Sequence, residues 1–197
     1  AKAMRAKAFV GDELRRLVLA QTYYAPVGES DPFDVYRAWR KLASNTGTSS
    51  FGYYIDMGET PMSPPLHVMG LSDELLFSRR RDDDDEGDPA LVLADALPHR
   101  KTTGDPPDVA AKLIRRVEDS SRHLWGGAVG YFCPGGESQI VLADRTITAQ
   151  SGNYWHTTGA ELTEEGDAME APELARHAAS QGLAAIAIAQ AQPKKTS

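Results

Sequence analysis

The chain has 197 residues, of which 41% are hydrophobic, and a formal net charge of −7. This length and composition suit a single domain, residues 1–197, with a sizeable core. No run approaches the roughly 18 consecutive apolar residues that a membrane span needs. The acidic balance argues against a nucleic-acid groove, because phosphate binding needs clustered positive charge. We therefore expect neither a membrane nor a nucleic acid as a partner.

The single cysteine, Cys133, cannot form an internal disulfide, so the fold does not depend on an oxidising compartment. The amino-terminal segment 1–10 is basic and Ala-rich, which is typical of a helix. It lacks the long apolar core of a signal peptide. We expect a cytoplasmic protein.

Glycine, proline and aspartate divide the first half of the chain into alternating elements. Residues 14–25 predict a strand. A helix is expected to begin near Pro32, because Ser30 or Asp31 can cap it and apolar residues follow at helical spacing. Its expected buried stripe comprises Phe33, Val35, Tyr36, Trp39, Leu42 and Ala43. Strands are expected at 51–58, 66–70 and 74–78.

Residues 79–89, RRRDDDDEGDP, form a charged run. Four consecutive aspartates suggest a metal site. However, consecutive side chains point in divergent directions, and the spacing fits no calcium loop. Neighbouring arginines also compensate the negative charge. We favour a solvated polar loop.

The second half of the chain predicts a helix that begins near 105–107 and buries Val109, Leu113 and Val117. The remaining expected elements are strands at 127–133, 138–149 and 154–162 and an Ala-rich helix at 171–190. A turn at 151–153 joins the last two strands. Together, these elements indicate an α+β fold in which antiparallel β-sheets pack against helices.

Arg145 is a charged residue within the apolar strand expected at 138–149. Because strand side chains alternate with period two, it would share a face with Val141, Ala143 and Ile147. A guanidinium on such a face needs an anion or water. Arg145 therefore indicates a bound carboxylate, with a structural salt bridge as the alternative.

The stretch 125–159 resembles the last part of the chorismate-utilising enzymes, a family that includes anthranilate synthase large subunit, aminodeoxychorismate synthase, isochorismate synthase and salicylate synthase. Further segments resemble the same family in the same order: 9–21, 31–42, 51–59, 68–77 and 101–118. In the segment 68–77, Asp73 stands where proline is usual. The resemblance implies a reduced form of the chorismate-utilising-enzyme fold.

A stretch of the family between the positions of Phe77 and Lys101 is missing, and the polar loop at 79–89 replaces it. In the family this stretch holds a Gly-Thr-Arg segment, an acidic helix with the first pair of magnesium-binding glutamates, and a strand with a catalytic histidine. Magnesium needs several oxygen ligands. The resemblance therefore implies that the ancestral chorismate activity is lost, and we expect no cofactor.

The resemblance also implies roles for individual residues. Arg145 would hold a substrate carboxylate, a task that suits a bidentate guanidinium. Lys101 stands where a hydroxyl is usual, and it either binds an anion or is simply exposed. Trp125 stands where tyrosine is usual, and it either lines the site or packs in the core. The other substrate-binding candidates are Gly126, Gly127, Thr158 and Gly159.

Glu161 replaces the second glycine of the family's Gly-Ala-Gly turn, whose backbone N–H groups receive the pyruvyl carboxylate. Its carboxylate would repel that ligand, and it either pairs with Arg145 or marks a surface strand end. Glu170 and Glu173 keep the i, i+3 spacing of the family's second magnesium motif. Without the first motif, we favour two acids that complement a helix amino terminus over metal ligands.

We expect a repurposed anthranilate-synthase-like protein of bacterial specialised metabolism that acts without metal on a small carboxylate-bearing molecule. A cyclisation, isomerisation or elimination needs little more than a shaped pocket and a proton donor. The candidate catalytic acid–base groups are Glu161, His156 and Tyr131. The alternative is a non-catalytic ligand-binding or partner protein. Because the deletion uncovers apolar surface, we also expect a homo-oligomer that covers it.

Overall fold

The computed structural model describes residues 14–45, 51–80, 88–119, 121–134, 136–163 and 170–192. The helix expected at 1–10 and the centre of the polar loop, 81–87, lie outside the described residues. The elements in chain order are β1 (Arg16–Pro26), α2 (Pro32–Asn45), β2 (Phe51–Met57), β3 (Leu66–Ser72), β4 (Leu75–Arg79), α3 (Pro89–Ala96), α4 (Arg100–Thr103), β5 (Gly104–Asp105), α5 (Pro107–Val117), β6 (Ala128–Phe132), β7 (Ser138–Leu142), β8 (Thr146–Gln150), β9 (Asn153–Thr163) and α6 (Ala171–Gln190).

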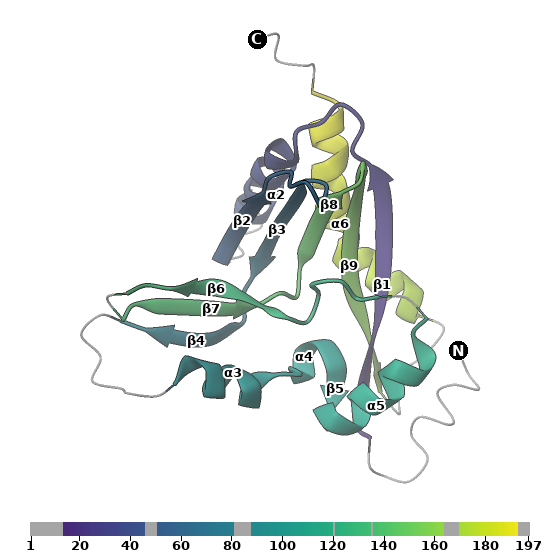
Figure 1. Ribbon diagram of the computed structural model, residues 1–197. Coiled ribbons are helices and arrows are strands. Elements are labelled where there is room, and N and C mark those ends of the chain that lie inside the picture. Colours follow the sequence, from purple (N-terminus) through teal and green to yellow (C-terminus); the bar gives the residue numbers. More distant parts are fainter. Residues whose placement is uncertain are drawn as a thin grey trace.

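A six-stranded antiparallel sheet, in the order β2-β3-β8-β9-β1-β5, forms the body of the molecule (Figure 1). Helices α2 and α6 pack against each other and cover one face of this sheet. The main core lies between them and the sheet, because alternate strand side chains point to this face. Its largest buried side chains include Trp39, Met69, Ile147, Tyr154 and Ile186.

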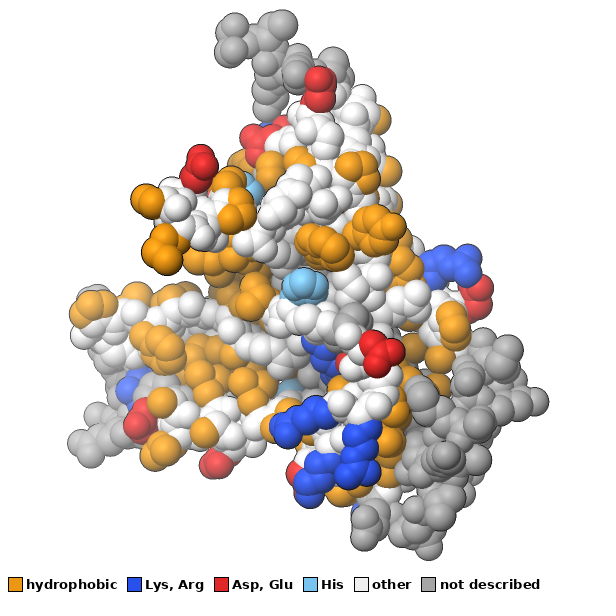
Figure 2. Space-filling model, turned by 45° about the vertical axis from the view of Figure 1, so that its right-hand side comes forward, with side chains coloured by type: hydrophobic (Ala, Val, Ile, Leu, Met, Phe, Trp, Pro, Cys, Tyr) orange, Lys and Arg blue, Asp and Glu red, His pale blue; other side chains and the backbone are white. Residues whose placement is uncertain are grey.

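A second antiparallel sheet, in the order β4-β7-β6, extends away from the first as an arm (Figure 1). Hydrophobic side chains gather on this arm (Figure 2). On β6, Tyr131 is 39% exposed and Phe132 is 57% exposed. These two large side chains are therefore available for contact with a partner.

The prediction of one continuous strand over 138–149 is wrong. Strands β7 and β8 belong to different sheets, and residues 143–145 form a bend between them. The N–H of Gly126 donates to the Ala143 carbonyl at 2.8 Å, and the N–H of Leu71 donates to the Arg145 carbonyl at 3.1 Å. An apolar run cannot reveal where a strand changes sheets, because both segments are buried. Arg145 therefore lies in a bend, not in a strand.

The other elements agree with the sequence. Helix α6 spans the predicted residues 171–190, and the remaining predicted strands lie within a few residues of their expected bounds. Helices α3 and α4 were not predicted. The mixed helices and antiparallel sheets confirm the α+β class.

Among the described residues, no helix is both long and apolar enough to cross a membrane.

Candidate functional site

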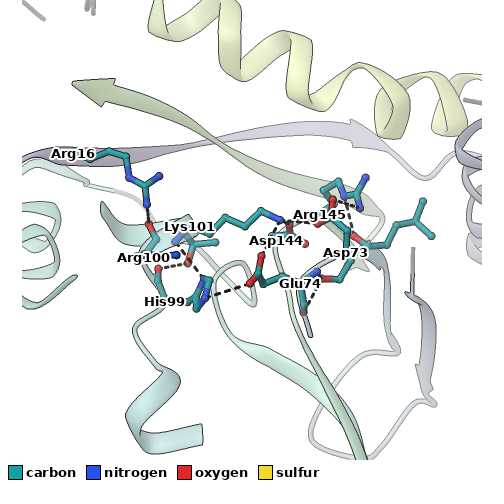
Figure 3. A network of polar contacts seen from close by, with 11 residues as sticks. Arg16, Asp73, Glu74, His99, Arg100, Lys101, Asp144 and Arg145 are labelled. Carbon is teal, nitrogen blue, oxygen red and sulfur yellow. Dashed lines mark hydrogen bonds and ion pairs between the residues drawn. The ribbon is translucent and has the colours of Figure 1, made fainter. Parts of the chain in front are cut away.

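Three segments that are far apart in sequence meet where the two sheets diverge (Figure 3). The turn between β3 and β4 contributes acids, the start of α4 contributes a histidine and two cations, and the bend between β7 and β8 contributes an acid and a cation. The residues are Asp73, Glu74, His99, Arg100, Lys101, Asp144 and Arg145. We call this group the polar network.

The carboxylate of Asp73 lies between two cations. Lys101 Nζ donates to Asp73 Oδ1 at 2.6 Å, and Arg145 Nη2 lies 3.7 Å from Asp73 Oδ2. Partial burial alone would raise the pKa of Asp73, but the Lys101 hydrogen bond and the two positive charges hold it below its usual value. The structure thus brings Lys101 and Arg145 together around a carboxylate of the protein itself.

Asp144 is the most buried acid of the polar network, with 8% of its side chain exposed. Its Oδ2 lies 2.8 Å from Lys101 Nζ, and its Oδ1 has no hydrogen-bond partner among the described residues. Burial would lower the pKa of Lys101, but hydrogen bonds to Asp144 and Asp73 outweigh it and raise that pKa. Lys101 is therefore a charged member of an ion-pair network.

Arg145 does not pair with Glu161, so that expected pairing is wrong. Arg145 Nε donates to the Leu71 carbonyl at 3.1 Å, and its remaining ionic partner in the described chain is Asp73. Glu161 instead accepts from Arg16 at 3.3 Å and is half exposed near the end of β9. Of the alternatives left open by the sequence, the structure therefore shows a structural salt bridge for Arg145 and a surface strand end for Glu161.

A cleft of about 470 Å³ opens beside the polar network. It is lined by Arg16, Glu74, His99, Arg100, Lys101 and Asp105. The side chain of Arg100 makes no ion pair with the described residues. The cleft therefore offers one guanidinium that has no ionic partner among the described residues.

His99 lies at the amino terminus of α4, where its Nδ1 accepts from the N–H of Lys101 at 3.3 Å. Because Nδ1 is an acceptor, the proton of the neutral ring sits on Nε2, 3.8 Å from Glu74 Oε1. Burial lowers the pKa of His99. The ring is therefore neutral at pH 7 and faces the cleft with a carboxylate behind it.

Trp125 packs against the sheet. A Cβ built at Gly159 would lie 2.7 Å from the Trp125 ring, so glycine is needed for the close approach. The indole Nε1 donates to the Asp144 carbonyl at 2.7 Å. Gly126 has a φ of +85° and, with Gly127, hydrogen bonds to Ala143. These residues hold the bend in place, beside the polar network.

The remaining predicted site residues lie elsewhere. Thr158 is buried and donates to the Ala175 carbonyl of α6 at 3.0 Å. His156 is fully buried against Trp39, with its Nδ1 donating to the Thr146 carbonyl at 2.9 Å. Burial lowers its pKa to about 4. Both side chains face the helices, away from the cleft.

The three candidate catalytic residues do not form one group. His156 and Glu161 are an odd number of positions apart on β9, so their side chains point to opposite faces. Tyr131 lies on the other sheet, where its hydroxyl donates to Glu137 at 3.0 Å. The structure does not bring these groups to a common substrate position.

Glu170 and Glu173 do not fit a magnesium site. Glu173 lies in the first turn of α6, is 68% exposed and pairs with Arg176. The described residues contain no group of three or more His, Cys, Asp or Glu placed to hold a metal ion. No step of the chemistry is therefore assigned to magnesium.

Most residues of the polar network and of the cleft could not be predicted from the sequence. Two acids could have been noticed: Asp73 stands where the family usually has proline, and Asp144 is next to Arg145 in sequence. No sequence pattern marked His99 and Arg100 of the network, or Arg16 of the cleft. Their positions depend on the way β1, α4 and the bend pack together.

Sequence comparisons relate part of this chain to enzymes that bind chorismate. Residues 84–180 match the family model described as chorismate binding enzyme. Aminodeoxychorismate synthase component 1 of Lactococcus lactis subsp. lactis is 33% identical over 79 residues, which cover 40% of this chain and 16% of that protein. Anthranilate synthase component 1 of Vibrio parahaemolyticus is 32% identical over 128 residues, which cover 64% of this chain and 23% of that protein. The chain thus aligns with less than a quarter of either relative.

Solved structures of similar fold include anthranilate synthase component I from Streptococcus pneumoniae, with a TM-score of 0.74, 17% identity and coverage of 92% of this chain and 57% of that chain. The menaquinone-specific isochorismate synthase MenF from Escherichia coli has a TM-score of 0.74 and 15% identity, with coverage of 94% and 59%. Residues 84–180 therefore match the chorismate-utilising enzyme family, and the chain has the fold of these enzymes over part of their length.

Proposed function

We propose that the protein is a repurposed anthranilate-synthase-like protein that binds a small carboxylate-bearing molecule in the cleft beside the polar network. The observation that carries this proposal is the exposed guanidinium of Arg100 on the cleft wall, which has no ionic partner in the described part of the chain. A guanidinium presents a planar fork that matches a carboxylate. Arg16 and Lys101 add positive charge nearby, although both also pair with acids of the protein.

The rest of the cleft wall supports a ligand with hydrogen-bond donors as well. Glu74 and Asp105 line the same cleft and can accept from a hydroxyl or ammonium group of the ligand. The cleft volume of about 470 Å³ suits a small molecule. An amino acid or a hydroxylated carboxylic acid meets these requirements.

Calorimetric titration of the protein with benzoate and with L-glutamine tests the proposal. Arg100→Ala should weaken binding at least about tenfold, because a hydrogen bond to a charged group contributes roughly 1.5–3 kcal/mol. Arg37→Ala is the matched control, since Arg37 is exposed on α2 and its ionic partner among the described residues is the neighbouring Asp34. Equal affinities for the wild type and Arg100→Ala would contradict the proposal.

For catalysis, we place the metal-independent chemistry at Glu74 and His99, in place of Glu161, His156 and Tyr131. The Glu74 carboxylate lines the cleft and can take up a proton from a ligand. The neutral His99 ring, whose Nδ1 accepts from the Lys101 N–H, can donate its Nε2–H to a ligand oxygen that gains negative charge. The non-catalytic alternative is a protein that only binds the ligand. His99→Gln separates the two, because loss of turnover with retained ligand affinity identifies an enzyme.

We do not expect the ancestral activity. Protein supplied with chorismate, magnesium and ammonia should form no anthranilate, aminodeoxychorismate, isochorismate or salicylate above background, since Glu173 is engaged by Arg176. Metal-dependent turnover of chorismate would contradict this expectation.

The expected homo-oligomer also stays a proposal. Strand β6 is an edge of the three-stranded sheet, so its outer backbone groups are free to pair with a second copy of the chain. Its exposed Tyr131 and Phe132 would be covered in such a pairing. Antiparallel pairing of two β6 strands would be symmetric and therefore closed.

A further inference from the structure

Asp73 occupies a position that suits a ligand carboxylate. Its two oxygens face two different cations, Lys101 Nζ at 2.6 Å and Arg145 Nη2 at 3.7 Å. These cations come from α4 and from the bend between β7 and β8, so no local sequence constraint forces them to converge. Two cations around one carboxylate form an anion-binding geometry, and here the anion is a side chain of the protein (Figure 3).

We propose that Asp73 is a specificity-determining residue, whose carboxylate fills this position so that the site accepts monocarboxylates and rejects dicarboxylates. The proposal deepens the proposed function and rests on it. One ligand carboxylate binds at Arg100 in the cleft. A second carboxylate that reaches toward Lys101 and Arg145 meets the carboxylate of Asp73 in its place.

The charges around Asp73 give the reason. Lys101 and Arg145 supply two positive charges, whereas Asp73, Glu74 and Asp144 supply three negative charges within 4 Å of them. A second ligand carboxylate therefore approaches a group with an excess negative charge, and like charges in a partly desolvated site repel strongly. Replacing Asp73 by asparagine removes that excess and keeps the side-chain shape.

Arg145 is the cation that loses its ionic partner in Asp73→Asn. Asp73 is its ionic partner in the described chain, and its Nη2 is buried without a hydrogen bond there. Without the Asp73 charge, the guanidinium retains only the Leu71 carbonyl as an acceptor. The side chains of Asp73 and Lys101 are 46% and 38% exposed, so a ligand group can reach the position from solvent.

The experiment compares wild type, Asp73→Asn and Asp34→Asn by calorimetric titration with acids matched in length: butyrate with succinate, valerate with glutarate, and caproate with adipate. In Asp73→Asn, the affinity ratio of the best dicarboxylate to its matched monocarboxylate should rise at least about tenfold, the value of one charge-assisted hydrogen bond. Asp34→Asn removes an exposed ion pair on α2 and should leave the ratio unchanged. Circular dichroism confirms that each variant is folded.

A double variant, Asp73→Asn with Arg145→Gln, should lose the gained dicarboxylate affinity. An unchanged ratio in folded Asp73→Asn overturns the inference, and monocarboxylate binding that still depends on Arg100 then leaves the proposed function standing. If the wild type binds no monocarboxylate but Asp73→Asn binds dicarboxylates, the proposed function fails and the inferred selectivity for monocarboxylates fails with it. Absence of binding in both proteins overturns both.

Discussion

Gly182 on α6 leaves room for the buried ring of His156. A Cβ built at position 182 would collide with the Nε2 edge of that ring, which lies between the sheet and the helix. Trp39 holds the other side of the ring, with centroids 5.4 Å apart and planes at 76°. The absence of one methyl group thus permits the helix to pack on a polar aromatic side chain.

Gly182→Ala should destabilise the protein by about 1–2 kcal/mol. Overpacking a core costs about 1–3 kcal/mol, and the better helix propensity of alanine returns up to about 1 kcal/mol. Denaturant unfolding measures the change. Ser180→Ala, at an exposed position of the same helix, is the control and should be neutral or slightly stabilising. An equally stable Gly182→Ala variant would contradict the packing described here.

Stability should fall as the pH decreases from about 6.5 to about 4, because of His156. Burial lowers its folded-state pKa to about 4, while the unfolded chain takes up the proton near 6.5. Between these values the unfolded state binds more protons, so the free energy of unfolding rises with pH. The contribution present above pH 6.5 is on the order of 3 kcal/mol.

Urea unfolding at a series of pH values measures this dependence. His156→Asn should flatten the curve in that range, because asparagine does not take up a proton. Its amide can still donate to the Thr146 carbonyl that His156 Nδ1 now reaches, so the variant can keep the fold. His177→Asn is the control, because His177 is exposed on α6. A wild-type curve that is flat between pH 6.5 and 4 would show that the ring is accessible to water.

Lys101→Met should cost about 2–3 kcal/mol of stability. The substitution leaves the carboxylate of Asp144 buried without the cation that now lies 2.8 Å away, and removal of one partner from a buried ion pair is strongly destabilising. Lys101→Met combined with Asp144→Leu should recover most of this loss. Lys41→Met, at an exposed position of α2, should have almost no effect on the denaturation midpoint.

The oligomer proposal predicts a concentration-dependent dimer in size-exclusion chromatography with light scattering. Phe132→Asp places a charge on the exposed edge strand β6 and should shift the protein to the monomer without loss of stability. Tyr24→Asp is a control, because Tyr24 is 72% exposed on β1, in the other sheet. A monomer at all concentrations would contradict the proposal.

Local patterns were sufficient to predict most elements of the fold. The helical stripe containing Trp39 reflects one-sided burial, which residue spacing reports directly. The bend at 143–145 could not be predicted in this way. The strands on both sides of the bend are buried, so burial gives no signal of a break between them. The change of sheet depends on hydrogen bonds to Gly126 and Leu71, which are distant in sequence.

The candidate site could be predicted only in part, because contacts between distant segments decide which residues meet there. Arg145 and Lys101 were singled out as cations that need anions, and the structure supplies those anions. That Asp73 and Asp144 are the acids is a consequence of tertiary packing. For Glu161 the sequence left two alternatives, a pair with Arg145 or a surface strand end; β9 continues as a strand and places the side chain at the surface, where it accepts from Arg16.

The bend between β7 and β8 has a consequence for the way the molecule unfolds. Ala143 exchanges hydrogen bonds with Gly126 and Gly127, the indole of Trp125 donates to Asp144, and Arg145 accepts from Leu71 of the large sheet. One short segment therefore carries hydrogen bonds that tie the arm to the body. The two sheets also share a buried cluster that contains Tyr53, Val68 and Val141, so we expect the arm and the body to unfold as a single cooperative unit.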